Sequence, residues 1–114
     1  MLTQVSQALR AGLPGRGRDR VDADLIGAKL RGADLRSISL RWAYLLGADL
    51  RAGNLIKTDL LGADLRSADL RGAHMADSLF LIQPQLTAAG GDGSTSLPEW
   101  LTRPEHWPSP GALS

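Results

Sequence analysis

Residues 23–82 read, in groups of five, ADLIG AKLRG ADLRS ISLRW AYLLG ADLRA GNLIK TDLLG ADLRS ADLRG AHMAD SLFLI. The third residue of every group is apolar. It is Leu in all groups but the last two, which have Met75 and Phe80. The first residue is Ala in most groups, and the fifth is often Gly. Self-similarity at a fixed short period predicts a solenoid in which successive copies stack on one another.

A period of five fits neither the 3.6-residue period of an amphipathic helix nor the strict alternation of a long strand. Within each group the alternation lasts for three residues, so the first and third side chains of an extended segment share one face. We therefore expect Ala and Leu to point inward and the intervening Asp to point outward. The fifth residue is predicted to be a corner, because Gly tolerates the positive φ angles that tight turns often require.

The predicted core is the column of third residues. Because these side chains fill the axis of the solenoid, we expect no pocket of the size that a small-molecule substrate or cofactor needs. The predicted structural core consists of Leu25, Leu30, Leu35, Leu40, Leu45, Leu50, Leu55, Leu60, Leu65, Leu70, Met75 and Phe80.

The A(D/N)LxG pattern of these groups resembles that of the pentapeptide-repeat family. The resemblance implies that four groups close one square coil and that coils stack into a right-handed quadrilateral β-helix. For residues 23–82 it implies an all-β solenoid of about three coils, in which a strand spacing of about 4.8 Å gives a rod only about 15 Å tall.

Residues 1–22 precede the repeats and are expected to form a helix and a basic linker. Leu2, Val5 and Leu9 share one face of a short amphipathic helix over Met1–Ala11. We expect this helix to cover the first coil, because solenoids need atypical terminal units. The alternative is that Met1 is a late start within a longer protein.

Residues 83–114 follow the repeats as a predicted cap helix and tail. The helix is expected over Gln83–Ala89, with Pro84 in its first turn, and should cover the last coil. Trp100 and Trp107 lie in a Pro-rich segment that is expected to pack back on the domain. The stretch from LFLIQPQL to LPEWLTRPEHW resembles C-terminal tails that follow the repeats in actinobacterial members of the family.

The outer surface offers two kinds of candidate contact. A 20-residue coil would align Arg31, Arg51 and Arg71 in a column on one wall, whereas two adjacent walls would be more apolar. An exposed apolar patch usually has a cover, and we consider the tail, a homodimer through the apolar walls or the C-terminal end, and another protein. The candidate interaction surface therefore comprises Arg31, Arg51, Arg71, Leu46, Leu61 and Leu81.

We predict no catalytic, cofactor-binding or metal site. His74 and His106 are the only histidines, there is no cysteine, and neither histidine has the neighbours of a metal-ligand cluster. The glycines lie at corners and never form GxGxxG before a helix. The outward Asp residues are expected only to keep the surface soluble beside their Arg neighbours. The chain is therefore predicted not to be an enzyme.

The predicted function is a non-catalytic structural or protein-interaction module with an unidentified partner. The alternative is a DNA-mimicking protein that binds gyrase, as some members of the resembled family do. That mimicry needs a long, strongly acidic rod, whereas this chain is short and has a net charge of +1. The even spread of charge also argues against nucleic acid and membrane surfaces as partners. Without a leader-like apolar run, we expect a cytoplasmic protein, and the resemblance of the tail implies a bacterial one.

Overall fold

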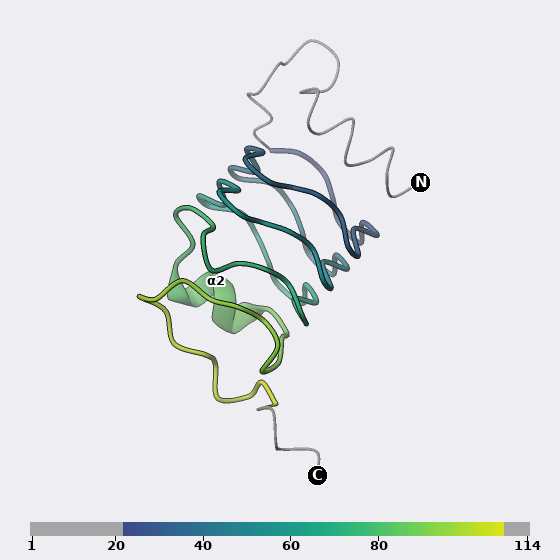
Figure 1. Ribbon diagram of the computed structural model, residues 1–114. Coiled ribbons are helices and arrows are strands. Elements are labelled where there is room, and N and C mark those ends of the chain that lie inside the picture. Colours follow the sequence, from purple (N-terminus) through teal and green to yellow (C-terminus); the bar gives the residue numbers. More distant parts are fainter. Residues whose placement is uncertain (1–21, 109–114) are drawn as a thin grey trace.

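The computed structural model describes residues 22–108. The predicted helix over Met1–Ala11 lies outside these residues. The repeats wind as a stack of turns, and the non-repeating C-terminal segment lies below them in Figure 1. Parallel bridges join residues 20 positions apart, so one turn has four sides, each made by one five-residue group. We number the sides by their ladders: side 1 has Asp24, Tyr44 and Asp64, side 2 has Lys29, Asp49 and Asp69, side 3 has Asp34, Asn54 and His74, and side 4 has Ser39, Asp59 and Leu79.

Each corner between two sides is a tight turn. The N–H of one group's first residue donates to the carbonyl of the preceding group's third residue, as Ala48 does to Leu45 at 3.0 Å. The fifth residue between them has a positive φ, which is +65° at Gly47. This combination defines a type II turn and explains the preference for Gly. The corners without Gly also have φ near +60°: Ser37, Trp42, Ala52, Lys57 and Ser67.

The core follows the axis of the stack. Every third residue from Leu30 to Met75 is at most 1% exposed, whereas Leu25 in the first turn is only partly buried. The first residues are small because they pack beside this column. At Gly53, an added Cβ would lie 3.1 Å from the Leu50 carbonyl oxygen. Thr58 replaces Ala in the core and satisfies its hydroxyl by donating to the Leu35 carbonyl at 2.6 Å.

The last repeat departs from the sequence-based assignment. Phe80, which we expected in the core, is 52% exposed, and Leu81, which we expected on an outer wall, is 1% exposed. The preceding corner already differs, because Lys57 donates its N–H to the carbonyl of Asp77 rather than of residue 76. Phe80 then adopts a φ of +61°. A shift by one residue exchanges the inward and outward side chains.

The chain continues as helix α2 (Gln83–Ala88), which lies across the end of the stack (Figure 1). Leu86 and Trp107 are buried there, at 0% and 4% exposure. Beyond α2, Gly90 bridges Asp69 and Ser96 bridges His74, so the ladders of sides 2 and 3 extend past the repeats. Within residues 22–108 no helix has the length and apolarity required to cross a membrane.

Candidate interaction surface

Exposed apolar side chains concentrate on one part of the stack, which we call the apolar wall. Its members are 40–64% exposed and come from side 4, from side 1 with the corners that bound it, and from the segment that follows the repeats. Among the described residues only one other large hydrophobic side chain is exposed, Ile56 on side 3. The apolar wall consists of Ile26, Trp42, Tyr44, Leu79, Phe80, Ile82 and Trp100.

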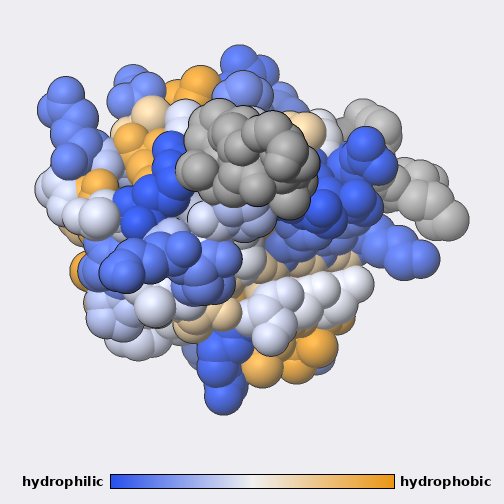
Figure 2. All heavy atoms as spheres, turned by 90° about the horizontal axis from the view of Figure 1, so that it is seen from below, coloured by the Kyte–Doolittle hydropathy of each residue, from blue (hydrophilic) through white to orange (hydrophobic). Residues whose placement is uncertain are grey.

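The wall differs in detail from the sequence-based candidates. Leu46 and Leu61 are half-buried, and Leu81 is buried. The indole N–H of Trp100 donates to the Leu81 main-chain carbonyl at 3.4 Å. Figure 2 views the molecule from its C-terminal end, where apolar groups lie at separate places around the edge with hydrophilic ones between them. The aromatic residues at corners and at the register shift therefore contribute more exposed apolar surface than the predicted leucines.

Trp42 is held on this wall by the corner below it. A Cβ added to Gly62 would lie 2.1 Å from Cε3 of the Trp42 ring, so the indole packs directly on the glycine. Gly62 also has a φ of +67°. The fixed indole remains 53% exposed, which makes it a rigid apolar contact rather than part of the core.

Phe80 is held on side 4 by a cation. The Arg41 guanidinium carbon lies 5.6 Å from the centre of the Phe80 ring, within the range of a cation–π contact. Nε of Arg41 also donates to the Asp59 carboxylate at 2.5 Å. Arg41 thus links the first two turns of side 4 to the aromatic ring of the third.

The arginine column is present but electrically balanced by Asp. Arg51 forms an ion pair with Asp49 at 2.7 Å and lies 3.8 Å from Asp69, which in turn pairs with Arg71 at 2.6 Å. The hydrogen bond from Arg51 is the largest cause that lowers the pKa of Asp49 to about 2. Arg31 stands exposed at the head of the column. The alternation of sign argues against a stripe that attracts phosphate.

The outward Asp residues have a structural role that sequence reasoning missed. The Asp49 carboxylate accepts the main-chain N–H of Arg51, two residues later, at 3.1 Å. Asn54 does the same for Ile56 with its side-chain oxygen at 3.2 Å. The second residue of a group is either Asp or Asn, and both carry the Oδ1 acceptor of such local turns. This exchange was the sequence signal that could have predicted the bond. The same bond is made by Asp24, Asp34, Asp59, Asp64 and Asp69.

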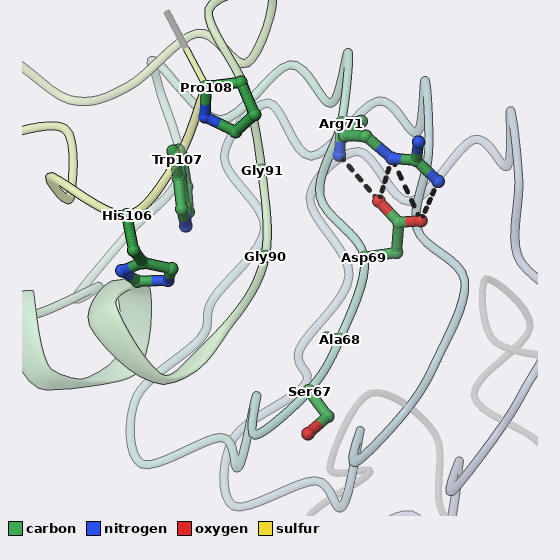
Figure 3. Close-up of a pocket in the computed structure, with 9 residues that line it drawn as sticks. All are labelled: Ser67, Ala68, Asp69, Arg71, Gly90, Gly91, His106, Trp107 and Pro108. Atoms are coloured by element: carbon green, nitrogen blue, oxygen red, sulfur yellow. Dashed lines mark hydrogen bonds and ion pairs between the residues drawn. The ribbon is translucent and has the colours of Figure 1, made fainter.

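A groove of about 390 Å³ lies between the third turn and the tail (Figure 3). The charged side chains on its rim, Asp69 and Arg71, bind one another. The indole N–H of Trp107 donates to the Ala89 carbonyl at 2.9 Å, and Nε2 of His106 lies 3.2 Å from the same oxygen. The described residues contain no cluster of three or more metal-ligating side chains. The groove thus offers neither an activated nucleophile nor a metal centre.

Comparison with protein families identifies the class of this fold. The family model for pentapeptide repeats matches residues 21–55 and 43–80, in eight copies. This match covers more than half of the chain, and the chain belongs to the pentapeptide-repeat family, a non-catalytic repeat family. Its fold is accordingly a right-handed quadrilateral β-helix. No protein of curated function matches the chain.

Two solved pentapeptide-repeat structures are similar to the chain. One is HetL from the cyanobacterium Nostoc, which is involved in the regulation of heterocyst differentiation, with 30% identity and a TM-score of 0.49. The other comes from the thylakoid lumen of Arabidopsis thaliana, with 23% identity and a TM-score of 0.35. The matches cover 74% and 73% of this chain, which spans only 36% and 59% of theirs.

Proposed function

We propose that this chain is a non-catalytic protein-interaction module whose contact surface is the apolar wall. The observation that carries the proposal is that nearly all large exposed apolar side chains of residues 22–108 come from two neighbouring sides of the stack and the segment after them, with exposures of 40–64%. Large exposed apolar patches mark interaction sites. Aromatic residues and Arg are also the residue types that interfaces favour at their centres.

The fixed geometry of the wall suits it to this role. Trp42 is seated on Gly62, and Phe80 lies beneath the Arg41 guanidinium, so neither ring has to be ordered when a partner binds. Anchors that are already ordered reduce the entropic cost of association. The partner we propose is a protein with an apolar surface of its own. A second copy of the chain would fulfil the same chemistry.

We further propose that the repeats form three coils and that residues 83–108 are their C-terminal cap. The cap is supported by Gln85, whose amide donates to the Leu60 and Ala63 carbonyls at 2.8 and 2.9 Å. The resemblance of the tail to those of actinobacterial members favours a cytoplasmic bacterial setting. The gyrase alternative has less support, because Asp49 and Asp69 pair with Arg51 and Arg71 and so do not form a one-signed acidic stripe.

Site-specific photo-crosslinking in cells that produce the protein tests the proposed contact surface. A photoreactive phenylalanine analogue replaces Tyr44 on the apolar wall or, as the matched control, His74. Both are exposed second residues of their groups, on sides 1 and 3. We expect a discrete adduct from position 44 and none from position 74. An adduct with twice the mass of the chain identifies a second copy as the partner, whereas equal crosslinking from both positions contradicts the proposal.

A further inference from the structure

The N-terminal edge of the stack carries main-chain groups that nothing in the described structure pairs. In lower turns the second residue of a group bonds to the turn above, as Asp49 donates its N–H to Ala28 at 2.9 Å and accepts from Leu30 at 2.8 Å. The first turn has no turn above it. Within residues 22–108 no hydrogen bond engages the main-chain N–H or C=O of Asp24, Lys29 or Ser39.

The apolar core is also incompletely covered at one part of this edge, although Leu30, Leu35 and Leu40 in the same turn are 0% exposed. Leu25 and Ala28 are partly buried, whereas Leu45 and Ala48, their equivalents one turn below, are 0% exposed. A sheet edge with free main-chain groups beside apolar side chains is a template for pairing with another chain. This end of the stack therefore needs a cover that supplies apolar side chains.

We propose that residues 1–11 of the same chain cover this edge as an amphipathic helix. Leu2, Val5 and Leu9 recur at helical spacing and provide one aliphatic face for Leu25 and Ala28. A helix of this length spans about 16 Å. One five-residue side of a turn, at most about 17 Å when extended, has a similar length.

The attachment point places the segment within reach. Asp22 enters the stack at the same edge, where its N–H donates to the Arg41 carbonyl at 3.2 Å. The connection over residues 12–21 can extend about 34 Å, which exceeds the width of one turn. Because the cover is tethered, it competes at high effective concentration with a second copy of the chain.

A paramagnetic label tests the location of the segment in the full chain. The natural sequence has no cysteine, so Val5→Cys provides a single attachment site for a nitroxide. We expect the strongest broadening at the Ala28 and Ser39 amide signals and weaker broadening at Ser78, which lies two turns further down the stack. Broadening at Tyr44 instead would place the segment on the apolar wall and overturn the proposal. Broadening that falls on dilution with unlabelled protein would assign the cover to a second copy.

A pair of matched charge substitutions tests the consequence for the edge. Val5→Asp with Leu9→Asp removes the aliphatic face, whereas Gln4→Asp with Gln7→Asp adds the same charge to the opposite face. We expect the first pair to speed amide exchange of Leu30 by about tenfold and to cause self-association, and the second pair to change neither. Equal exchange in the two variants would contradict the proposal. Crosslinking from position 44 tests the apolar wall independently of either result.

Discussion

The two ends of the stack differ in how far the described chain satisfies their main-chain groups. A repeat satisfies its main-chain groups through the copies above and below, so both terminal turns lack one neighbour. At the C-terminal end, residues 85–96 supply the missing partners from a segment without repeats. At the N-terminal end, the main-chain groups of Asp24, Lys29 and Ser39 have no partner within the described chain. The comparison shows that the hydrogen-bonded ladders of a solenoid can continue after its sequence repeats stop.

Side chains replace main-chain donors at the C-terminal end. The Gln85 amide serves two carbonyls, and the Thr95 hydroxyl donates to the Leu70 carbonyl at 2.7 Å. The Asp92 carboxylate accepts the main-chain N–H and the hydroxyl of Ser94. Gly90 continues the ladder with its own main chain, accepting from Leu70 and donating to Ala68.

Removal of the C-terminal segment should have the largest effect, because the C-terminal end of the stack would then lose its hydrogen-bond partners. Truncation after Ile82 deprives the third turn of its hydrogen-bond partners and exposes Met75, so we expect aggregation. Truncation after Ala89 keeps the Gln85 contacts, and we expect a folded but self-associating chain. Size-exclusion chromatography with light scattering separates these outcomes. A monodisperse monomer from the shorter chain would show that the segment does not protect the end.

A single side chain should account for part of this effect. Gln85→Leu leaves the Ala63 carbonyl without its donor, whereas the Leu60 carbonyl keeps the Ala63 N–H. A buried unsatisfied group typically costs about 1–3 kcal/mol. We expect the free energy of unfolding to fall by that amount in urea titrations. Thr87→Ala, an exposed change on the same helix, is the control and should alter it by less than about 0.5 kcal/mol. Similar losses for both would contradict a bonding role for Gln85.

Acid should weaken the C-terminal end through Asp92. The hydrogen bond from the Ser94 hydroxyl is the largest cause that lowers the pKa of Asp92 below its ordinary 3.8. A carboxyl whose pKa is lower in the folded chain than in the unfolded chain stabilises the fold at pH values above its unfolded pKa. This stability is lost as the pH falls through the folded pKa. We expect Asp92→Asn to make the decline of the urea midpoint below about pH 4 shallower. Glu99→Gln, which removes an exposed carboxylate of the same segment, is the control for the loss of one negative charge.

The smallest effect should come from a corner within the repeats. Ala52 has a φ of +57°, which L-residues reach at a cost of about 1–2 kcal/mol. We expect Ala52→Gly to stabilise the fold by about 0.5 kcal/mol after the greater chain entropy of Gly is included. Ala76→Gly is the matched control at a turn position without positive φ and should destabilise slightly. Thermal unfolding measures both, and a loss of stability in Ala52→Gly would refute strain at this corner.

The sequence predicted the interior of the repeats well because each group repeats the same local problem. The inward leucines follow from the alternation of Ala, Asp and Leu, and the β-helix from the family pattern. The exchange of Phe80 and Leu81 could not be predicted, since both are apolar and SLFLI continues the five-residue rhythm. The role of Gln85 was equally hidden, because its partners Leu60 and Ala63 are defined only once α2 docks.

Because one turn has four sides, only changes of length by whole turns keep every later residue on its side of the stack. Adding or removing four groups, a change of 20 residues, would return every later residue to the same side and leave α2 facing the same carbonyl positions. One added group would instead rotate the C-terminal segment by a quarter turn about the axis. The contacts of the C-terminal segment would then move to another side of the stack. The aromatic side chains that follow the added group would no longer lie next to those of side 1. Insertions that lengthen the stack but keep the orientation of the C-terminal segment about its axis must therefore consist of whole turns.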